Sequence, residues 1–352
     1  MKRSPLLVIH RVSGLIAGLF ILLLSVSGSL LVFSDEFRML EAPPLVLRAQ
    51  APLIGVDSCF RRVRQAFPRS AILSAELTHS PQQAYVFSIA DSLNPDHWQR
   101  RTVYLHPQNG TIQLVKAADQ GWLYQLKRLH SSFFLGKKGE WWLGVCGLFF
   151  LLNLLTGLVI YRRSLVAALL LRRHLSNRKN LHQLVGVYAL LFNLLIAFSG
   201  TWMQRYVFTA SFYQASAYRP AYHSSAPLFF SPDSALREMK KTYPEFTAQV
   251  IYFASRKTGS TAVYGSRSGN GFIQSKKLAD AVFLDSLGGP ARTAFLENLD
   301  AGTRFDITNS QLHSGQYGGW ILKCIYSLLG LTGGLLSVTG FFMWKRSRSN
   351  GP

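Results

Sequence analysis

Four runs of apolar residues dominate the pattern of hydrophobic and polar positions along the chain. They cover Leu6–Phe33, Trp141–Tyr161, Leu184–Met203 and Trp320–Trp344. A helix needs about 20 mostly apolar residues to cross the hydrocarbon core of a bilayer, and each run reaches that length. The pattern therefore predicts four transmembrane helices. The first run is too long for the apolar part of a cleaved secretory signal, so we expect it to be retained.

The two long segments between these runs show a different pattern. Strand-like stretches bounded by turn residues are "QAYVFSIA" and "RTVYLHPQNGTIQLV" in the first segment, and "AQVIYFAS" and "DAVFLDSLGGPART" in the second. The stretches "DSCFRRVRQAF" and "SALREMKKTY" precede them and have the apolar spacing of helices. Each segment is therefore expected to form a small α+β module outside the membrane.

The expected order of parts follows from these two patterns. It is a first transmembrane helix at 1–34, a module at 35–128, a segment with a histidine and the second helix at 129–163, a basic link at 164–180, a third helix at 181–203, a second module at 204–311, a matching segment with the fourth helix at 312–346, and a tail at 347–352. The fold class is thus an α-helical membrane protein with two extramembrane modules.

The two halves of the chain repeat each other. At an offset of 183 residues, His130, Gly147, Thr156 and Gly157 match His313, Gly330, Thr339 and Gly340. At an offset of 172 residues, His10, Gly14, Ser27 and Gly28 match His182, Gly186, Ser199 and Gly200. Each half contains an outgoing helix, a module and a returning helix. The chain is therefore a tandem duplication with parallel repeats, related by an axis along the membrane normal.

Composition and charge agree with a membrane protein. Apolar residues make up 48% of the chain and charged residues only 16%, although the net charge is +21. Many cations lie beside helix ends: Lys2, Arg3 and Arg11, then Arg162, Arg163, Arg172, Arg173, Arg178 and Lys179, and finally Lys345, Arg346 and Arg348. Because such clusters mark cytoplasmic ends, both termini and the link are expected in the cytoplasm and both modules outside it. A good part of the net positive charge thus lies beside membrane ends, where attraction to anionic lipid explains it. No nucleic-acid partner is expected.

Histidine is the candidate ligand. Of nine histidines, His10, His182, His130 and His313 occupy matched positions in the repeats, and the predicted topology places the first two near one membrane face and the last two near the other. A single histidine at a helix end is usually an interfacial residue. Four that persist through a duplication indicate function instead, because ionisable groups in membrane segments are costly.

The residues around these histidines narrow the ligand to haem. Gly14 and Gly28 share a helix stripe with His10, since Gly28 lies five turns beyond His10, and Gly186 and Gly200 repeat the stripe on the third helix. Such bare stripes suit a flat ligand, although close helix packing is the alternative. A bare metal site needs three or four ligands, but two imidazoles fill both axial positions of a haem iron. With no CxxCH motif for covalent attachment, we expect two haem b groups.

The same stretches carry a family resemblance. "HRVSGLIAGLFILLLSVSGSLLVF", "LHQLVGVYALLFNLLIAFSG", "LHSSFFLGKKGEWWLGVCGLFFLLNLLTGL" and "LHSGQYGGW" with "LLSVTGFFMWKRSR" resemble the PepSY-associated transmembrane proteins, which include iron-regulated membrane proteins and siderophore reductases of the ferrioxamine type. The resemblance covers all four helices. In the modules, "VYLHPQNGTIQLV" fits the end of a PepSY domain well and "VFLDSLGGPART" poorly.

The resemblance implies a location and an activity. It implies a protein of the inner membrane of a Gram-negative bacterium, with PepSY-like periplasmic modules and two haems held by the four matched histidines. The protein would pass electrons outward to a ferric siderophore, possible types including the hydroxamates, and release ferrous iron. The candidates for contact with the siderophore are Tyr206, Tyr213, Tyr218 and Tyr222, although aromatic residues next to a membrane also form interfacial belts.

The sequence leaves the electron donor and the function class open. The glycine-rich "GSRSGNG" lacks the strand–turn–helix context of a dinucleotide site, and the cytoplasmic parts are too short for a flavin or nicotinamide domain. Electrons are therefore expected from a quinol or a separate reductase. Two other functions stay open: a periplasmic sensor or protease regulator without catalysis, and a transporter for iron or siderophore. The lack of charged residues in the middle of the helices disfavours transport.

Overall fold

The structure is a computed structural model that describes residues 4–42, 45, 51–91, 100–162, 178–209, 228–253, 260–267 and 280–349. The chain divides into a helical unit, made of residues 1–34, 125–215 and 309–352, and a sheet unit, made of residues 35–124 and 216–308. Three chain segments build the helical unit and two build the sheet unit. The predicted basic link lies almost wholly outside the described residues.

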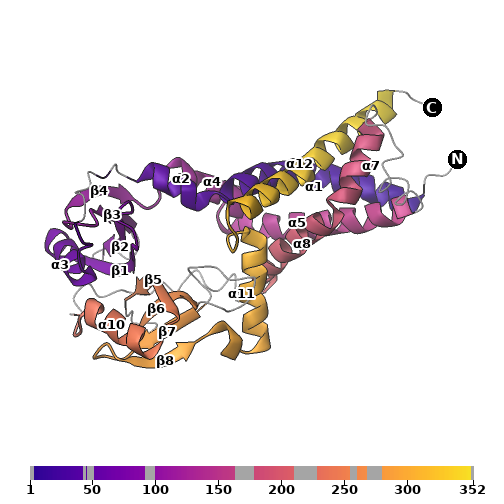
Figure 1. Cartoon of the computed structure of the whole chain (residues 1–352). Helices are drawn as coiled ribbons and strands as arrows, with labels where there is room; N and C mark the ends of the chain where they lie inside the picture. The colour runs from indigo at the N-terminus through magenta and orange to yellow at the C-terminus, as the bar shows by residue number, and fades with distance from the viewer. Residues whose placement is uncertain are drawn as a thin grey trace. The chain divides into compact units, whose positions relative to one another are not determined.

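Five helices form most of the helical unit (Figure 1): α1 (Pro5–Leu31), α5 (Lys137–Tyr161), α7 (Arg178–Tyr188), α8 (Leu190–Met203) and α12 (Trp320–Ser349). Helix α1 packs on α5 and α12, α5 packs on α8, and α12 packs on α7. In the described part of the chain, α1, α5 and α12 are each long and apolar enough to cross a membrane. The predicted third helix is instead the pair α7 and α8.

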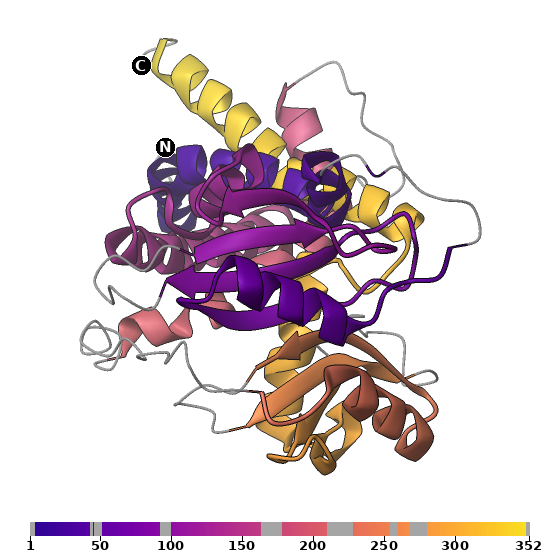
Figure 2. The same ribbon diagram turned by 90° about the vertical axis from the view of Figure 1, so that its left-hand side faces the viewer.

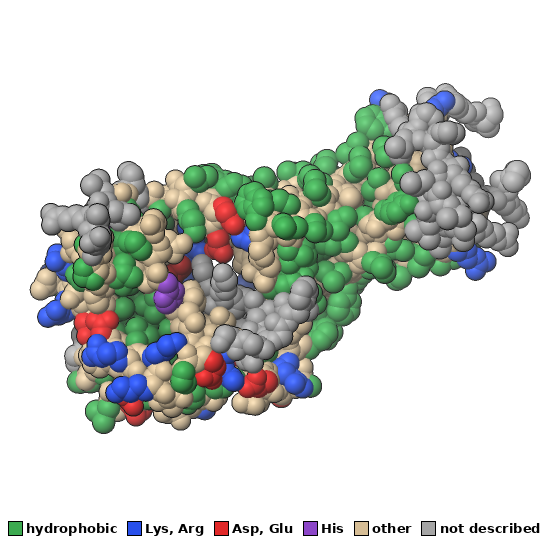
Figure 3. Space-filling view, viewed as in Figure 1, with side chains coloured by type: hydrophobic (Ala, Val, Ile, Leu, Met, Phe, Trp, Pro, Cys, Tyr) green, Lys and Arg blue, Asp and Glu red, His purple; other side chains and the backbone are tan. Residues whose placement is uncertain are grey.

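The surface of the helical unit is largely apolar. Leu191 is 82% exposed and Leu328 is 68% exposed, and hydrophobic side chains cover much of the helices in Figure 3. In the same view the charged side chains gather mainly over the sheet unit. Helices keep every backbone hydrogen bond within themselves, so an apolar surface of this kind is stable in lipid. These features identify a membrane protein with three or four spanning helices.

The break between α7 and α8 is a departure from repeat symmetry. The two helices are bent by 68°, and Ala189 between them has φ −93° and ψ 4°. The equivalent residue in the first half, Ala17, lies inside the continuous helix α1. Sharp bends usually lie near proline or glycine, and Gly186 precedes this break by about one turn, but its repeat counterpart Gly14 lies inside the unbroken helix α1. The apolar pattern alone therefore predicted one helix where the structure has two.

Two shorter helices of the chain carry the second set of histidines. Helix α4 (Trp122–Ser132) contains His130, and α11 (Ala301–Ser314) contains His313. After α4 the chain reverses through Phe133 and Phe134, whose φ angles are 47° and 63°, and after α11 it turns at Gly315 with φ 65°. Left-handed conformations are unfavourable for residues other than glycine, so the first turn is strained. The turns place α4 and α11 immediately before α5 and α12.

The sheet unit contains one antiparallel sheet of eight strands. The strands are β1 (Ser70–Glu76), β2 (Tyr85–Asp91), β3 (Arg100–Leu105), β4 (Ile112–Ala117), β5 (Phe246–Tyr252), β6 (Thr261–Arg267), β7 (Asp280–Leu284) and β8 (Pro290–Ala294), and the order across the sheet is β4-β3-β2-β1-β5-β6-β7-β8. The helix of the first half is α3 (Val56–Ala66) and that of the second is α10 (Pro232–Thr242). Each half of the sequence thus supplies one helix and four strands; the pattern predicted the helix and three of the strands, and it missed β1 and β6.

The two halves, which the sequence analysis treated as two modules, are joined in one sheet. Strand β1 pairs with β5 through Ser74 with Tyr252, Ala75 with Ile251 and Glu76 with Val250. Without this pairing both strands would leave an open edge, which is a site of unwanted association. In Figure 2, α3 and α10 lie on the same side of the sheet, each over the strands of its own half. The core between these helices and the sheet includes Val63 of α3, Phe87 of β2 and Val263 of β6.

The first turns of α3 and α10 also join the two halves. Asp233 Oδ1 accepts a hydrogen bond from the Val56 N–H at 2.8 Å, and its Oδ2 accepts one from the Asp57 N–H at 3.0 Å. In return, Asp57 Oδ1 accepts from the Asp233 N–H at 3.3 Å, and Asp57 also contacts the Ser231 hydroxyl. Each carboxylate therefore caps the helix of the other half.

The remaining short elements complete the two units. They are α2 (Ser34–Glu41), η3 (Arg205–Phe208) and η5 (Leu296–Asn298). Helix α2 is tied to the first strand because Arg38 bridges Asp35 at 2.6 Å and Glu76 at 2.7 Å. Because the side chains of these pairs are one-third exposed, we assign them only a small contribution to stability.

Candidate metal centres

The four matched histidines form two pairs in the helical unit. The first pair is His10 of α1 with His182 of α7, whose ring centres are 6.4 Å apart with an angle of 87° between the ring planes. The second pair is His130 of α4 with His313 of α11, whose ring centres are 6.3 Å apart at 46°. Each pair combines one histidine from each half of the chain, as the predicted topology requires.

The separation within each pair matches that of two imidazoles that share one metal ion. An imidazole nitrogen binds a first-row metal at about 2.0–2.1 Å and lies about 1.1 Å from the centre of its own ring, so two opposed imidazoles have centres roughly 6.2–6.4 Å apart. Both pairs fall in this interval.

A buried hydroxyl group contacts Nδ1 of every one of these histidines. The four contacts are His10 with Thr156 at 3.0 Å, His182 with Thr339 at 2.8 Å, His130 with Ser27 at 2.9 Å and His313 with Ser199 at 2.9 Å. The hydroxyl residues are themselves at matched positions in the repeats. The duplication has therefore preserved the partner of each histidine together with the histidine.

These contacts fix which nitrogen carries the proton. Thr156 donates its own hydrogen to the Leu152 carbonyl at 2.7 Å, and Ser27 donates to the Leu23 carbonyl at 2.6 Å. A hydroxyl that has donated its hydrogen can only accept from the ring, so Nδ1 is the protonated nitrogen. The lone pair then lies on Nε2, which is the nitrogen left for a metal ion.

Glycines at matched positions give the imidazole rings room. A Cβ added to Gly28 would lie 2.9 Å from Cε1 of His130, and one added to Gly200 would lie 2.9 Å from Cε1 of His313. Gly157 is close to His10 in the same way, at 3.2 Å. The sequence predicted that Gly28 and Gly200 clear a flat ligand beside His10 and His182. In the structure they instead accommodate the rings of the second pair.

The other two predicted glycines have different neighbours. The nearest atom to a Cβ on Gly14 would be Oδ1 of Asn153 at 3.2 Å, and for Gly186 it would be a methyl carbon of Leu336 at 3.7 Å. Gly14 nevertheless lines the cavity beside the first pair, whereas Gly186 is not among the lining residues. The single stripe predicted on α1 therefore serves both pairs, one at each end.

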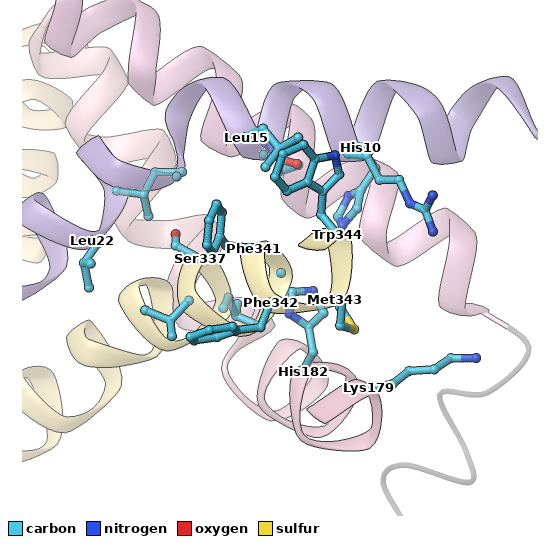
Figure 4. A pocket seen from close by; sticks show the side chains of 18 of the residues that line it. His10, Leu15, Leu22, Lys179, His182, Ser337, Phe341, Phe342, Met343 and Trp344 are labelled. Atoms are coloured by element: carbon cyan, nitrogen blue, oxygen red, sulfur yellow. The ribbon is translucent and has the colours of Figure 1, made fainter. Parts of the chain in front are cut away.

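A large cavity adjoins the first pair. Its volume is about 1430 Å³, above the roughly 300–1,000 Å³ of most small-molecule pockets. His10 and His182 enter it from different helices, and Phe341, Phe342 and Trp344 of α12 lie beside them (Figure 4). The space is thus mostly apolar, with imidazoles projecting into it. A large, flat, apolar ligand with a metal at its centre fits this combination.

The two pairs lie near opposite ends of the helices. Ser27, which contacts His130, follows His10 by 17 residues on α1. At 1.5 Å per residue this separation is about 25 Å. One histidine pair therefore cannot supply a ligand to the other. The two pairs are therefore separate candidate sites.

The donor set of each centre is two neutral imidazoles. Among the described residues, no three side chains of His, Cys, Asp or Glu come together. Two imidazoles leave a bare zinc or iron ion short of protein ligands, whereas they complete the coordination of an iron that a porphyrin already holds in its plane. The histidines present therefore fit haem b as axial ligands.

Other described histidines lie outside the two pairs. Nε2 of His79 lies 2.7 Å from the Ala248 carbonyl, and Nδ1 of His106 accepts from the Gln108 N–H at 3.2 Å. Both are in the sheet unit and are held by the backbone. Their surroundings give no indication of a ligand role.

The predicted siderophore contacts are only partly visible. Tyr206 lies in η3, where its hydroxyl donates to Glu140 Oε2 at 3.1 Å, and burial together with this carboxylate raises the pKa of Tyr206 to about 12. Arg205 stacks on Trp202 at 4.7 Å. Such aromatic and basic residues at a helix end are typical of an interfacial belt. The other three candidates, Tyr213, Tyr218 and Tyr222, lie outside the described residues.

Sequence reasoning overlooked the hydroxyl residues as part of the site. Ser27, Ser199, Thr156 and Thr339 were recognised as matches between the repeats but not as partners of the histidines. The same hydroxyl residue at both matched positions could have indicated this role, because a small polar residue buried in an apolar helix needs a hydrogen-bond partner.

Comparison with known proteins agrees with the sequence resemblance. The family model described as the PepSY-associated TM region matches residues 7–347, which is nearly the whole chain. A search of curated proteins gives no match. The match spans both histidine pairs and all the described strands. The chain belongs to the PepSY-associated transmembrane family.

Proposed function

We propose that this protein is an inner-membrane reductase with two haem b groups, which transfers electrons to a ferric siderophore in the periplasm and releases ferrous iron. The observation that carries the proposal is the pairing of the four matched histidines. Both pairs have the ring separation of a shared metal ion, and in both pairs Nδ1 is bonded to a hydroxyl.

The residues of each centre have separate tasks. His10 and His182 would hold one haem and His130 and His313 the other, and each bound haem would supply a one-electron carrier. The buried hydroxyls bind Nδ1 of the rings and would leave Nε2 available to hold the haem. The apolar helices exclude water from the centres, which lowers the local dielectric constant and thereby helps to set the redox potential.

The direction of transfer rests on the predicted topology. Basic residues such as Arg162, Lys345 and Arg346 lie at the ends of α5 and α12, and such clusters favour the cytoplasmic side. The first pair would then face the cytoplasm and the second pair the periplasm. Electrons would enter near the first pair from a quinol, which also releases protons, or from a reduced soluble protein.

The proposed chemistry at the outer face is a one-electron reduction. One electron from the protein converts the ferric ion of the chelate to the ferrous ion, and no bond to carbon is made or broken. Hard oxygen ligands such as hydroxamates suit ferric iron better than ferrous iron, so reduction weakens the complex. Iron leaves as the ferrous ion, and the siderophore is left intact.

A reoxidation experiment tests this proposal. Protein purified with its haem and reduced with dithionite is freed of reductant and mixed anaerobically with a ferric hydroxamate siderophore. We expect the reduced haem spectrum to disappear while ferrous iron accumulates in a chelator assay, one ferrous ion for each electron. The gallium complex of the same siderophore is the control, since it cannot be reduced. A spectrum that stays reduced with ferric siderophores of every class would refute the reductase activity.

Two other functions remain as alternatives. A periplasmic sensor or protease regulator would use the sheet unit to bind protein, and a transporter would move iron or siderophore through the helices. Neither requires histidines at the separation of a shared metal ion. The reductase accounts for this separation, so it is the function that the geometry supports best.

A further inference from the structure

The cavity beside the first histidine pair has a basic end. Arg11 of α1, Lys179 of α7 and Arg346 of α12 all line it. Among the described lining residues there is no Asp or Glu. Three helices that are far apart in the sequence thus each place a cationic residue on the lining of one cavity. A ligand of this cavity should carry negative charge at the same end.

The rest of the lining is apolar. Leu22 and Phe150 lie deep along the helices, and Leu336 and Phe341 come from α12. In Figure 4, Leu22 and Lys179 are at opposite ends of the lining, with His10 and His182 between them. The cavity is therefore amphiphilic along its length. It suits a ligand with a broad apolar body and an anionic edge.

The cations are close to the histidines along their helices. Arg11 directly follows His10, and Lys179 precedes His182 by three residues, which is about one helical turn. Arg346 follows Thr339, the partner of His182, by seven residues, or about two turns. An anionic group bound by these side chains would therefore belong to the ligand that the histidines bind.

We infer that Arg11, Lys179 and Arg346 bind the two carboxylate side groups of the haem held by His10 and His182. The inference rests on the proposed function, because it requires a haem in this centre. Guanidinium and ammonium groups form charge-assisted hydrogen bonds with carboxylates, and a guanidinium can bind one in bidentate fashion. The basic end then sets which edge of the macrocycle faces the end of the helices.

An anionic lipid headgroup has similar charge and is the competing occupant. Basic residues at the end of membrane helices attract such lipids without any cofactor. The histidines argue for the haem, because a lipid would leave two imidazoles at the separation of a shared metal without a function. The experiment below separates the two.

Two double variants form a matched comparison. The test variant is Lys179→Gln with Arg346→Gln, which removes two cations from the cavity. The control is Arg162→Gln with Lys345→Gln, which removes two exposed cations from the same ends of α5 and α12 but outside the lining. Both lose the same charge near the membrane surface, so only contact with the ligand distinguishes them. Arg346→Lys provides a version that keeps the charge.

The probes are protohaem and its dimethyl ester, in which both carboxylates are blocked. They are added to apoprotein in nanodiscs, in a His313→Ala background that leaves the first centre alone. With Lys179 and Arg346 unsubstituted, we expect the protein to bind protohaem at least about tenfold more tightly than the ester, since hydrogen bonds to charged groups are stronger than those to neutral groups. In the test variant this preference should fall to about twofold, while the control keeps it.

The midpoint potential gives a second readout. Ferric haem carries one more positive charge than ferrous haem, so the loss of nearby cations stabilises the ferric state relative to the ferrous state. The midpoint potential of the first centre should therefore fall in the test variant. A tenfold shift of the redox equilibrium corresponds to about 59 mV for one electron. The control and Arg346→Lys should stay close to the unsubstituted potential.

Three results would overturn the inference. One is a test variant that still prefers protohaem over the ester and keeps its potential. Another is loss of bound phosphatidylglycerol from the test variant with unchanged haem properties, which would assign the cations to lipid. Both leave haem bound at the first centre, so the proposed function would stand. A wild-type protein that binds no haem at all would instead refute the proposed function together with the inference.

Discussion

The hydroxyl oxygen of Thr156 lies 3.0 Å from Nδ1 of His10, and its repeat counterpart Thr339 lies 2.8 Å from Nδ1 of His182. Since each threonine already donates its hydrogen to a backbone carbonyl one turn earlier, it accepts from the imidazole. The arrangement keeps the Nε2 lone pair of each histidine available for a metal ion.

Removal of this hydroxyl should weaken one centre and spare the other. For Thr156→Val we expect haem at the first centre to be bound about 10- to 100-fold more weakly, because partners of a ligating histidine contribute that much to affinity. Its midpoint potential should rise, since the imidazole becomes a poorer electron donor. Thr201→Val is the control, because the Thr201 hydroxyl donates to the Ala197 carbonyl of its own helix at 2.6 Å. Haem dissociation and redox titration measure both effects.

Gly28 should tolerate no side chain. A Cβ at this position would lie 2.9 Å from the His130 ring, so Gly28→Ala should displace the ring and remove the second haem while the first remains. Gly186→Ala is the control, since its Cβ would meet its nearest neighbour, a methyl carbon of Leu336, at an ordinary 3.7 Å and Gly186 does not line the cavity. Haem content by pyridine haemochrome decides the outcome. Equal haem loss in both variants would show that the effect is general helix packing.

The two centres should differ in their electron paramagnetic resonance spectra. Ring planes are 87° apart in the first pair and 46° apart in the second. Perpendicular axial ligands leave the iron orbitals nearly degenerate and produce a highly anisotropic low-spin ferric signal, whereas less perpendicular planes reduce the anisotropy. We expect two distinct signals, of which His313→Ala keeps the more anisotropic one. Identical signals from both centres would contradict the ring geometry.

The reciprocal caps between Asp57 and Asp233 should stabilise the sheet unit. Asp233→Ala removes the acceptor of two N–H groups of α3 and should lower the free energy of unfolding by about 1–2 kcal/mol. Cys59 is a suitable probe, because burial raises the pKa of its thiol to about 12 and the folded unit should resist alkylation. The rate of Cys59 labelling in urea, with Cys146 and Cys324 replaced by alanine, measures the change.

Glu238→Ala is the control for this prediction. Glu238 lies on α10 and its side chain is 54% exposed, so its loss should change stability little. Asp57→Ala should resemble Asp233→Ala, and the double variant should cost less than the sum because both changes break the same joint. Strict additivity would show that the two caps act independently.

Much of the helical unit was predictable from local pattern. Apolar runs located α1, α5 and α12, and the constant offsets between His10 and His182 and between His130 and His313 indicated the pairs. These signals are local or repeat with a fixed period, so a sequence displays them directly. The family resemblance rests on the same stretches, and the family match confirms it.

Long-range contacts were less predictable. The bend at Ala189 follows Gly186 by one turn, yet the matching Gly14 accompanies no bend in α1, and the pairing of β1 with β5 joins residues almost two hundred positions apart. Packing between distant segments decides both features. Gly28 is another example. Helix periodicity places it on the same face of α1 as His10, but the side chain that it contacts is that of His130, which only the folded chain reveals.

Haem content of four single variants tests the central claim most directly. The wild-type protein should contain two haems, and alanine at His10, His182, His130 or His313 should lower the content to about one. His10→Ala and His182→Ala should leave the same residual haem, with one potential and one spectrum, and His130→Ala and His313→Ala should both leave the other. The account would be contradicted if His10→Ala and His130→Ala left the same haem, or if any of the four variants kept both.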